Sequence, residues 1–203
     1  MYLNKYVRIS NTLVEHAANF INILFILKKR EVFQLVTTVA IQELKSVESY
    51  IDSLSQLLIE TVNDGASIGF LPPLEQAEAE QYWNNTLKPE VVLFIATINN
   101  EIVGSVQLYL DTKQNGAHRA EIGKLMTHPK FRRKGIGRLL MEAAEDRAKK
   151  ENRSLLVLDT REGDPSNHLY SSLGFNEAGR IPYYAKSANG DLHTTVFYYK
   201  FSN

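Results

Sequence analysis

The segment from Arg119 to Ala148 constrains the fold more than any other part of the chain. Its first eight residues form a predicted strand, and Gly135 and Gly137 then lead into an apolar pattern at positions 136, 139, 140, 143, 144 and 148. This spacing predicts an amphipathic helix. From Lys124 to Arg138 the sequence holds six basic residues and no acidic one. Because free N–H groups and the helix dipole attract anions to a helix start, and glycines let an anion approach, the segment predicts an anion-binding turn.

Two familiar phosphate motifs do not fit this turn. A dinucleotide fingerprint requires a third glycine or small residue where this chain has Leu140. A nucleoside triphosphate loop requires G-x-x-x-x-G-K followed by Ser or Thr, a string that is absent from the sequence. For the segment taken alone, the remaining alternative is an ordinary strand-to-helix turn beside solvated basic residues.

Length and composition limit the function classes. With 203 residues the chain is long enough for one domain with an appendage. It carries 23 Lys and Arg and 23 Asp and Glu, so its formal net charge is zero. A protein held to nucleic acid or to an anionic membrane mainly by bulk charge is therefore disfavoured. The absence of cysteine excludes disulfides, a catalytic thiol and cysteine-ligated metal.

Residues 1–32 are predicted to be an N-terminal extension ahead of a domain of residues 33–203. Their most apolar run, Phe20–Leu27, ends at Lys28-Lys29-Arg30. It is too short to cross a bilayer, and basic residues that follow an apolar run do not match a secretory signal. We therefore expect a cytoplasmic protein with no membrane partner. The extension is expected to be either a helix that packs on the domain or a partner, or a poorly folding segment from an upstream start codon.

The remaining patterns predict a mixed α/β chain. The turn signal Asn99-Asn100 between two apolar runs predicts a hairpin over Val91–Leu110, and Ser154–Leu158 is typical of a buried parallel strand. Ser46 is the expected N-cap of a helix over 46–60, and Pro73 suits the first turn of a helix over 73–87. Further strands are predicted at 33–39, 119–126, 177–184 and 193–201, and further helices at 136–148 and 166–173. This order predicts a mixed sheet of about seven strands with helices on its faces.

The motif R-x-x-G-x-G at Arg132 to Gly137 resembles the acetyl-coenzyme A loop of the GCN5-related N-acetyltransferases (GNAT). The predicted strand order is similar to theirs from Phe33 to the C-terminus. The resemblance implies the GNAT fold, an α/β (α+β) domain with a central mixed, mostly antiparallel sheet and helices on both faces. It also implies acetyl-CoA as the acetyl donor, held by Arg132, Arg133, Lys134, Gly135, Ile136, Gly137 and Arg138.

Five strings look like a narrower group, the tabtoxin-resistance type of acetyltransferase, which acetylates a small amine-bearing toxin. In chain order they are ETVNDGASIGF at 60–70, RAEIGKLM at 119–126, LDT at 158–160, LYSSLGF at 169–175 and LHTTVFYYK at 192–200. The likeness implies acetyl transfer to the amine of a small molecule, such as an antibiotic or toxin. The alternatives are acetylation of a protein lysine or N-terminus, and a non-catalytic acetyl-CoA-binding module.

By the same resemblance, the strand before the turn supplies a backbone donor. An N–H near Leu125 or Met126 is expected to polarise the acetyl carbonyl, in the manner of an oxyanion hole. Leu125, Met126 and Thr127 are therefore expected to contact the coenzyme.

Two carboxylates are expected to face the amine. Glu121 lies on the strand before the turn and is the expected base, and Asp159 ends the neighbouring predicted strand. Which of them takes the proton stays open, because a cation between two carboxylates also holds its own proton more tightly. The structural alternatives are a salt bridge of Glu121 with Arg119 or Lys124, and a helix or turn cap for Asp159.

Tyr170 is the expected general acid for the departing thiolate, since a phenol can donate its proton without a prior charge. Ordinary packing is the alternative for this tyrosine. Asn167 lies on the same helix face and is expected to contact the coenzyme. Because the chain has no cysteine to accept the acetyl group, direct attack in a ternary complex is favoured over an acetyl-enzyme.

The acceptor pocket is expected to include Ser67, Phe70, Tyr183 and His193 together with the two carboxylates. The histidines show no metal-ligand spacing, so no metal is expected. Nucleic acid is not expected as a partner, because the basic cluster is short and the diphosphate of the coenzyme accounts for it. Self-association is common in the family, so the resemblance allows a homodimer, although the sequence shows no interface.

Overall fold

The computed structural model describes residues 38–201 of the chain. The extension predicted for residues 1–32 and most of the strand predicted for 33–39 lie outside the described residues. Thr38 and Val39, the described end of that predicted strand, are not in a strand, and the first described strand is β1, Ala40–Leu44. The strand therefore begins later than the β-branched run Val36–Val39 suggests, at the first residue that pairs with its neighbour β2.

A seven-stranded mixed sheet forms the centre of the domain, with the strand order β1-β2-β3-β4-β5-β7-β6. The β4–β5 pair is parallel, and the other neighbouring strands are antiparallel. The strands after β1 are β2 (Val91–Ile98), β3 (Glu101–Leu110), β4 (Arg119–Thr127), β5 (Leu155–Arg161), β6 (Asn176–Lys186) and β7 (Leu192–Phe201). The predicted fold class is confirmed, including the parallel placement of the 154–158 run.

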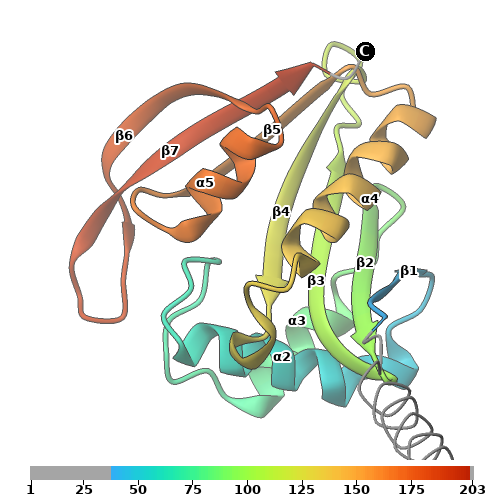
Figure 1. Cartoon of the computed structure of the whole chain (residues 1–203), viewed down its shortest axis with the longest axis vertical. Coiled ribbons are helices and arrows are strands. Elements are labelled where there is room, and N and C mark those ends of the chain that lie inside the picture. The colour runs from blue at the N-terminus through green and yellow to red at the C-terminus, as the bar shows by residue number, and fades with distance from the viewer. Residues whose placement is uncertain (1–37, 202–203) are drawn as a thin grey trace, which may run out of the picture. The chain divides into compact units, whose positions relative to one another are not determined.

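Helices cover both faces of the sheet (Figure 1). They are α2 (Ile51–Asn63), α3 (Gln76–Asn84), α4 (Ile136–Lys150) and α5 (Pro165–Ser172). Phe94 and Ala96 of β2 pack in the cluster that includes the apolar side of α4, whereas Leu93 and Ile95 pack in the cluster that includes α2 and α3. Because alternate residues of a strand face opposite sides, the hydrophobic run of β2 supplies both cores.

Local chemistry explains several helix and strand ends. Asn99 and Asn100 have positive φ angles of 50° and 67°, which a two-residue hairpin turn requires and which asparagine tolerates. The prediction of Ser46 as a helix N-cap is wrong. Ser46 Oγ accepts a hydrogen bond from the Glu48 N–H at 3.2 Å, but Val47 is the N-cap of a 3-10 turn over Glu48–Tyr50, and the α-helix starts only at Ile51, with Tyr50 as its N-cap.

The helix predicted for 73–87 is shorter than expected. Glu75, its N-cap, has an extended backbone with ψ 149°, so α3 begins at Gln76. At the other end the Asn85 side chain donates to the carbonyl of Gln81, and the Thr86 hydroxyl donates to that of Tyr82. These side chains satisfy the last carbonyls and end the helix before Leu87. In the described part of the chain, no helix combines the length and apolar character needed to cross a bilayer.

Candidate active site

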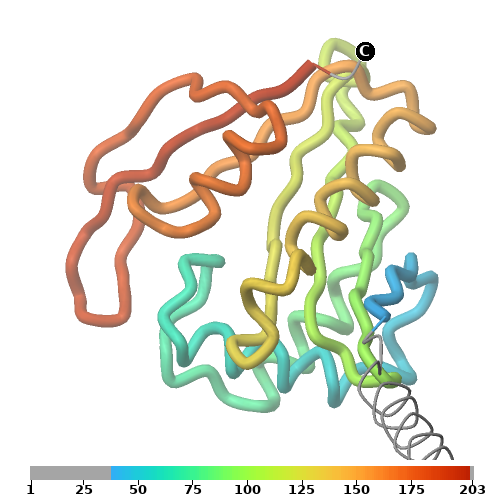
Figure 2. The backbone as a smooth tube through the Cα atoms, viewed as in Figure 1, coloured from blue at the N-terminus to red at the C-terminus, as the bar shows by residue number. Residues whose placement is uncertain are grey.

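Strands β4 and β5 are paired only at their beginnings. The parallel register runs from Arg119 opposite Leu155 to Glu121 opposite Val157. Beyond this point β4 continues to pair with β3, and β5 continues to pair with β7, so the two parallel strands diverge (Figures 1 and 2). The sheet thus opens beside the carboxyl ends of two adjacent parallel strands, where α/β sheets commonly bind ligands.

Glu121 and Asp159 lie on the two sides of this opening. Their neighbours Ile122 and Leu158 belong to the α4 core, so strand alternation directs both carboxylates to the opposite face of the sheet, the one that α2 and α3 cover. The predicted pair of carboxylates therefore shares one face. Glu121 does not form the alternative ion pair with Arg119, because Arg119 pairs with Asp111.

Partial desolvation raises the pKa of both carboxyl groups. For Glu121, lost hydration raises the pKa most and the negative charge of Asp159 adds to it, whereas Lys124 and Arg119 lower it. For Asp159, lost hydration raises the pKa and Lys124 opposes the change. A carboxylate with a raised pKa is a better proton acceptor, so both groups are suited to take a proton from an amine.

The coupling to Lys124 identifies a residue that the sequence analysis considered only as an ion-pair partner. Between the pairs Ser105 with Met126 and Gln107 with Gly123, one residue of β3 faces two residues of β4, Lys124 and Leu125. This is a β-bulge, and Lys124 has a φ angle of 52° in it. A bulge leaves backbone groups of the strand without ladder partners, and the donor expected near Leu125 or Met126 stays a prediction.

The glycine turn, residues 132–137, leaves helix α4 without a side-chain cap. Gly135 is the N-cap residue with a φ angle of 79°, and a side chain there would contact nothing within 4 Å. The first helical bond runs from the Leu139 N–H to the Gly135 carbonyl, and the N–H groups of Ile136, Gly137 and Arg138 donate to no described backbone carbonyl. The turn therefore leaves three N–H groups without backbone acceptors at the positive end of a 15-residue helix, as an anion site requires.

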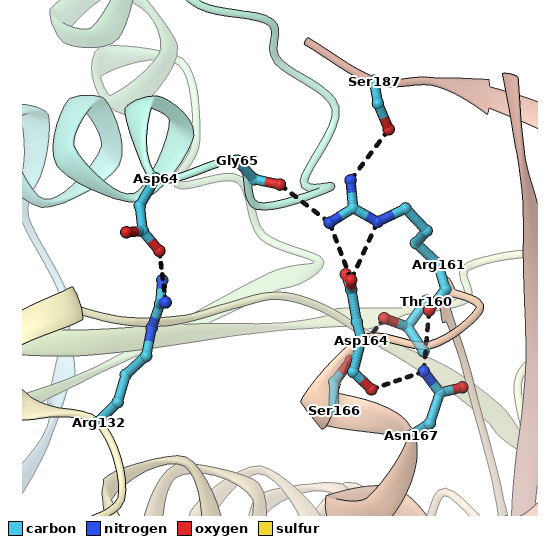
Figure 3. A network of polar contacts seen from close by, with 9 residues as sticks. All are labelled: Asp64, Gly65, Arg132, Thr160, Arg161, Asp164, Ser166, Asn167 and Ser187. Atoms are coloured by element: carbon cyan, nitrogen blue, oxygen red, sulfur yellow. Dashed lines mark hydrogen bonds and ion pairs between the residues drawn. The ribbon is translucent and has the colours of Figure 1, made fainter. Parts of the chain in front are cut away.

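Basic side chains of this segment are already engaged with protein groups. Arg132 forms an ion pair with Asp64, the residue that follows α2 (Figure 3). Arg138 donates to the Ser172 hydroxyl at 2.7 Å, and the Lys134 ammonium lies 4.9 Å from the centroid of the Phe131 ring. The contacts of Arg132, Arg133, Lys134 and Arg138 with a coenzyme stay predictions.

Tyr170 lies on α5 with its ring in the core between Phe175 and Tyr198. Burial raises its pKa strongly, and the nearby charges of Asp159 and Asp164 act in the same direction, so the phenol stays protonated at neutral pH. No described residue forms a hydrogen bond with its hydroxyl. It is thus a proton donor without a competing acceptor, although its ring is also a packing element.

The side chain of Asn167 builds the turn between β5 and α5. Its Nδ2 donates to the carbonyls of Arg161 and Asp164, each at 2.8 Å, and its Oδ1 accepts from the Tyr198 hydroxyl at 2.9 Å. Figure 3 shows the first two of these contacts. Because protein partners engage both the amide nitrogen and the oxygen, the structure gives Asn167 a positioning role, and its contact with the coenzyme stays a prediction.

Arg161 is a second residue that the sequence analysis missed. Its guanidinium donates twice to Asp164 Oδ1, at 3.0 and 2.8 Å, once to the Gly65 carbonyl at 3.0 Å and once to the Ser187 hydroxyl at 3.0 Å (Figure 3). It thereby joins β5, the start of α5, the β6–β7 turn and the loop after α2. No local pattern marks it, since two of these partners are distant in sequence.

Two cavities adjoin the loop of residues 64–70. Ser67 and Arg161 line one cavity of about 220 Å³, and Tyr82, Gln107 and Tyr109 line the other, of about 470 Å³. Phe70 lines both. Four residues predicted for the acceptor pocket line neither of these cavities: Glu121, Asp159, Tyr183 and His193. Tyr183 is 75% exposed, because it lies on the edge strand β6, which is exposed along most of its length.

Tyr109 connects the larger cavity with Glu121. It lines the cavity and is the cross-strand partner of Glu121, which does not itself line the cavity. A side chain added at Gly123 would lie 3.0 Å from Tyr109 Cε2 and 4.0 Å from Glu121 Oε1, so the glycine leaves space that both groups border. Gln107 fixes the two tyrosines that line the larger cavity. Its amide nitrogen donates to the Tyr82 hydroxyl at 2.7 Å, and its amide oxygen accepts from the Tyr109 hydroxyl. Within residues 38–201, no group of three or more acidic or histidine side chains could hold a metal ion.

Comparison with known proteins agrees with this geometry. The family model described as Acetyltransferase (GNAT) family matches residues 57–175. A curated relative from Azospirillum brasilense, an uncharacterized N-acetyltransferase in the hisH-hisA intergenic region, is 32% identical over 106 residues, which are 51% of this chain and 63% of the relative. This chain thus spans less than two thirds of that relative's length.

Solved structures share the fold at low sequence identity. An N-acetyltransferase from Staphylococcus aureus Mu50 has a TM-score of 0.71 at 14% identity, covering 82% of this chain and 99% of that one. The yncA protein of Salmonella typhimurium, solved with its cofactor acetyl-CoA, has a TM-score of 0.68 at 16% identity, covering 81% and 94%. The seven-stranded sheet with helices on both faces is therefore the fold of these proteins.

Proposed function

Because this chain belongs to the acetyltransferase (GNAT) family, we propose that it is an N-acetyltransferase that transfers an acetyl group from acetyl-CoA to the amine of a small molecule. The observation that carries the proposal is that two features lie at the two ends of β4. The strand begins beside two carboxylates at an opening in the sheet and ends in a glycine turn with free N–H groups. An acyl donor with a diphosphate and an amine acceptor are the two ligands that these features suit.

The residues present fit the coenzyme. The N–H groups of Ile136, Gly137 and Arg138 and the dipole of α4 suit a diphosphate, and Gly135 leaves the approach open. Bound acetyl-CoA supplies the activated acetyl group as a thioester. The bulge at Lys124 and Leu125 offers a backbone N–H of β4 to polarise the acetyl carbonyl.

The carboxylates and Tyr170 handle the protons. Asp159 and Glu121 bind the ammonium form of the acceptor and take a proton from it, which frees the lone pair for attack on the carbonyl. As the C–N bond forms and the C–S bond breaks, the Tyr170 hydroxyl gives its proton to the leaving thiolate, and the resulting phenolate takes the second proton from the acylated nitrogen. Because the chain has no cysteine, we propose direct attack in a ternary complex.

The size and lining of the larger cavity support a small acceptor. About 470 Å³ is within the range of pockets for small molecules, and the walls combine three aromatic rings with seven polar or charged side chains. The likeness to the tabtoxin-resistance type supports an amine antibiotic or toxin as the acceptor. Acetylation of a protein lysine or N-terminus is the alternative that the test below distinguishes.

The test combines coenzyme binding with thiol release. We expect calorimetry to detect acetyl-CoA binding, and thiol release when small amines or amine antibiotics are added. Glu121→Gln should slow release by about 100-fold at neutral pH without a change in acetyl-CoA affinity. An exposed residue offers the matched control, Glu101→Gln. Absence of acetyl-CoA binding would refute the proposal, and release with peptides alone would favour the protein acceptor.

A further inference from the structure

We propose that Lys124 is a positioning residue that fixes the 64–70 loop on β4 and places a positive charge beside Asp159 and Glu121, the two carboxylates proposed to meet the substrate amine. The inference rests on the proposed function for the role of the two carboxylates. It gives a function to a lysine that lies between the acceptor side and the coenzyme side of the strand.

The 64–70 loop is shaped around the Lys124 ammonium. The Nζ atom donates a 2.7 Å hydrogen bond to the Ile68 carbonyl and lies 5.5 Å from the centroid of the Phe70 ring. Between them, Gly69 has a φ angle of 86°, and a Cβ there would lie 2.9 Å from Nζ. Three consecutive loop residues thus accommodate one cation, through a carbonyl, a missing side chain and an aromatic face.

The backbone of Lys124 is unusual in the same place. A φ angle of 52° is uncommon for a residue other than glycine, asparagine or aspartate, and it occurs at the bulge of β4. Such conformations persist where the surrounding structure enforces them, and they concentrate at functional sites. The bulge directs a side chain from the middle of the sheet onto the loop, which a regular strand would not do at this position.

The charge of Lys124 acts on both carboxylates. It lowers the pKa of both groups, whereas the two carboxylates repel each other, so each opposes the ionisation of the other. Burial lowers the pKa of Lys124 itself, while Asp159 and Glu121 oppose that change.

The other titratable groups near this pair lie on three elements. They are Arg119 on β4, Tyr109 on β3 and Tyr170 on α5. Residues 65–70 of the loop contain no titratable side chain. Lys124 is therefore the cation whose removal changes the charge at both carboxylates, and its replacement is a direct test.

The experiment compares Lys124→Met, which removes the charge, with Lys124→Arg, which keeps it, in the full chain. Removal of the cation raises the pKa of the base, so the acid limb of kcat/KM against pH should move upward by about one pH unit in Lys124→Met. Activity below that limb should then fall about tenfold while the alkaline plateau is kept. Lys124→Arg should leave the limb in place. Lys149→Met, the same change at an exposed position of α4, is the control.

Two measurements on the free protein separate this inference from the proposed function. Carboxyl NMR titration should show higher pKa values for Glu121 and Asp159 in Lys124→Met, whether or not any amine is acetylated. Hydrogen exchange in peptides that cover residues 64–70 should be faster in the same variant. An unchanged limb with unchanged carboxyl titrations, or an activity loss that is equal at all pH values, would overturn the inference.

Discussion

Arg132 forms an ion pair with Asp64, and this contact joins the first residue of the glycine turn to the end of helix α2 (Figure 3). Both side chains are about two-fifths exposed, at 43% and 40%. An exposed pair of this kind stabilises a protein by only about 0–1 kcal/mol. The ion pair therefore keeps the arginine near the anion site. A ligand that binds the arginine instead loses little free energy by breaking the pair.

Coenzyme affinity is expected to respond to Asp64. In Asp64→Asn, Arg132 loses its competing carboxylate and becomes available to a diphosphate, so acetyl-CoA should bind more tightly, by up to about fivefold. Arg132→Met should weaken binding. Calorimetry measures both, with the exposed α2 variant Asp52→Asn as the control. Weaker binding by Asp64→Asn would show that the ion pair organises the site instead of competing for it.

The glycine turn predicts a contrast between two alanine substitutions. At Gly135, a φ angle of 79° is unfavourable for alanine, so Gly135→Ala should lower the free energy of unfolding by about 1–2 kcal/mol. At Gly137 the φ angle is not positive, and the added Cβ would lie 3.3 Å from Leu169 Cδ2. Gly137→Ala gains helix propensity, but its Cβ is crowded by Leu169. Its effect on the free energy of unfolding should therefore be smaller. Urea unfolding measures the free energy of unfolding of both variants. An equal decrease in the two would contradict the role of backbone conformation at Gly135.

Tyr170→Phe should separate catalysis from coenzyme binding. The substitution keeps the ring between Phe175 and Tyr198 but removes the proton donor, so kcat should fall about 100-fold while acetyl-CoA affinity is kept. Tyr184→Phe, at an exposed position, is the control. If Tyr170→Phe keeps full activity with a good acceptor, Tyr170 is a packing residue.

The same tyrosine predicts a pH dependence of stability. Burial raises its pKa in the folded state above the value near 10 of an unfolded chain. Its contribution to stability is therefore complete below about pH 10 and decreases as the pH rises toward the folded-state pKa. Stability measured by urea unfolding should decline less steeply above pH 10 in Tyr170→Phe than in the wild type. An identical decline would contradict the assigned cause.

The larger cavity predicts which amines are good acceptors. Its lining includes the acids Glu78 and Glu90 and the single base Lys88, together with the aromatic rings of Phe70, Tyr82 and Tyr109. An acidic, aromatic lining favours a cation and disfavours a second carboxylate. Phenethylamine should therefore have a kcat/KM at least about tenfold above that of phenylalanine, which differs only by its carboxylate. The reverse order would place the acceptor elsewhere. The double variant Glu78→Gln, Glu90→Gln should reduce the difference in kcat/KM between the two amines.

Local sequence patterns determined the elements that surround the site. Apolar spacing identified α4 from Ile136 onward, Asn99-Asn100 identified the hairpin turn, and Gly135 and Gly137 identified the turn that begins α4. These features could be read because each depends on residues a few positions apart, where hydrophobic periodicity and backbone preference act directly. Glu121 and Asp159 were predicted through resemblance, and strand pairing places them on one face, while their catalytic roles stay predictions.

Only the tertiary structure decided how the site is held together. The Lys124 ammonium meets a carbonyl 56 residues away, the Arg132 guanidinium a carboxylate 68 residues away, and the Arg161 guanidinium a carbonyl 96 residues away. All three partners belong to the 64–70 loop. No periodicity or motif encodes such contacts, because they depend on where the sheet and helices bring distant segments together. Local sequence thus specifies the turns and the apolar faces of the helices and strands. The contacts of three cationic side chains with one loop arise only in the packed fold.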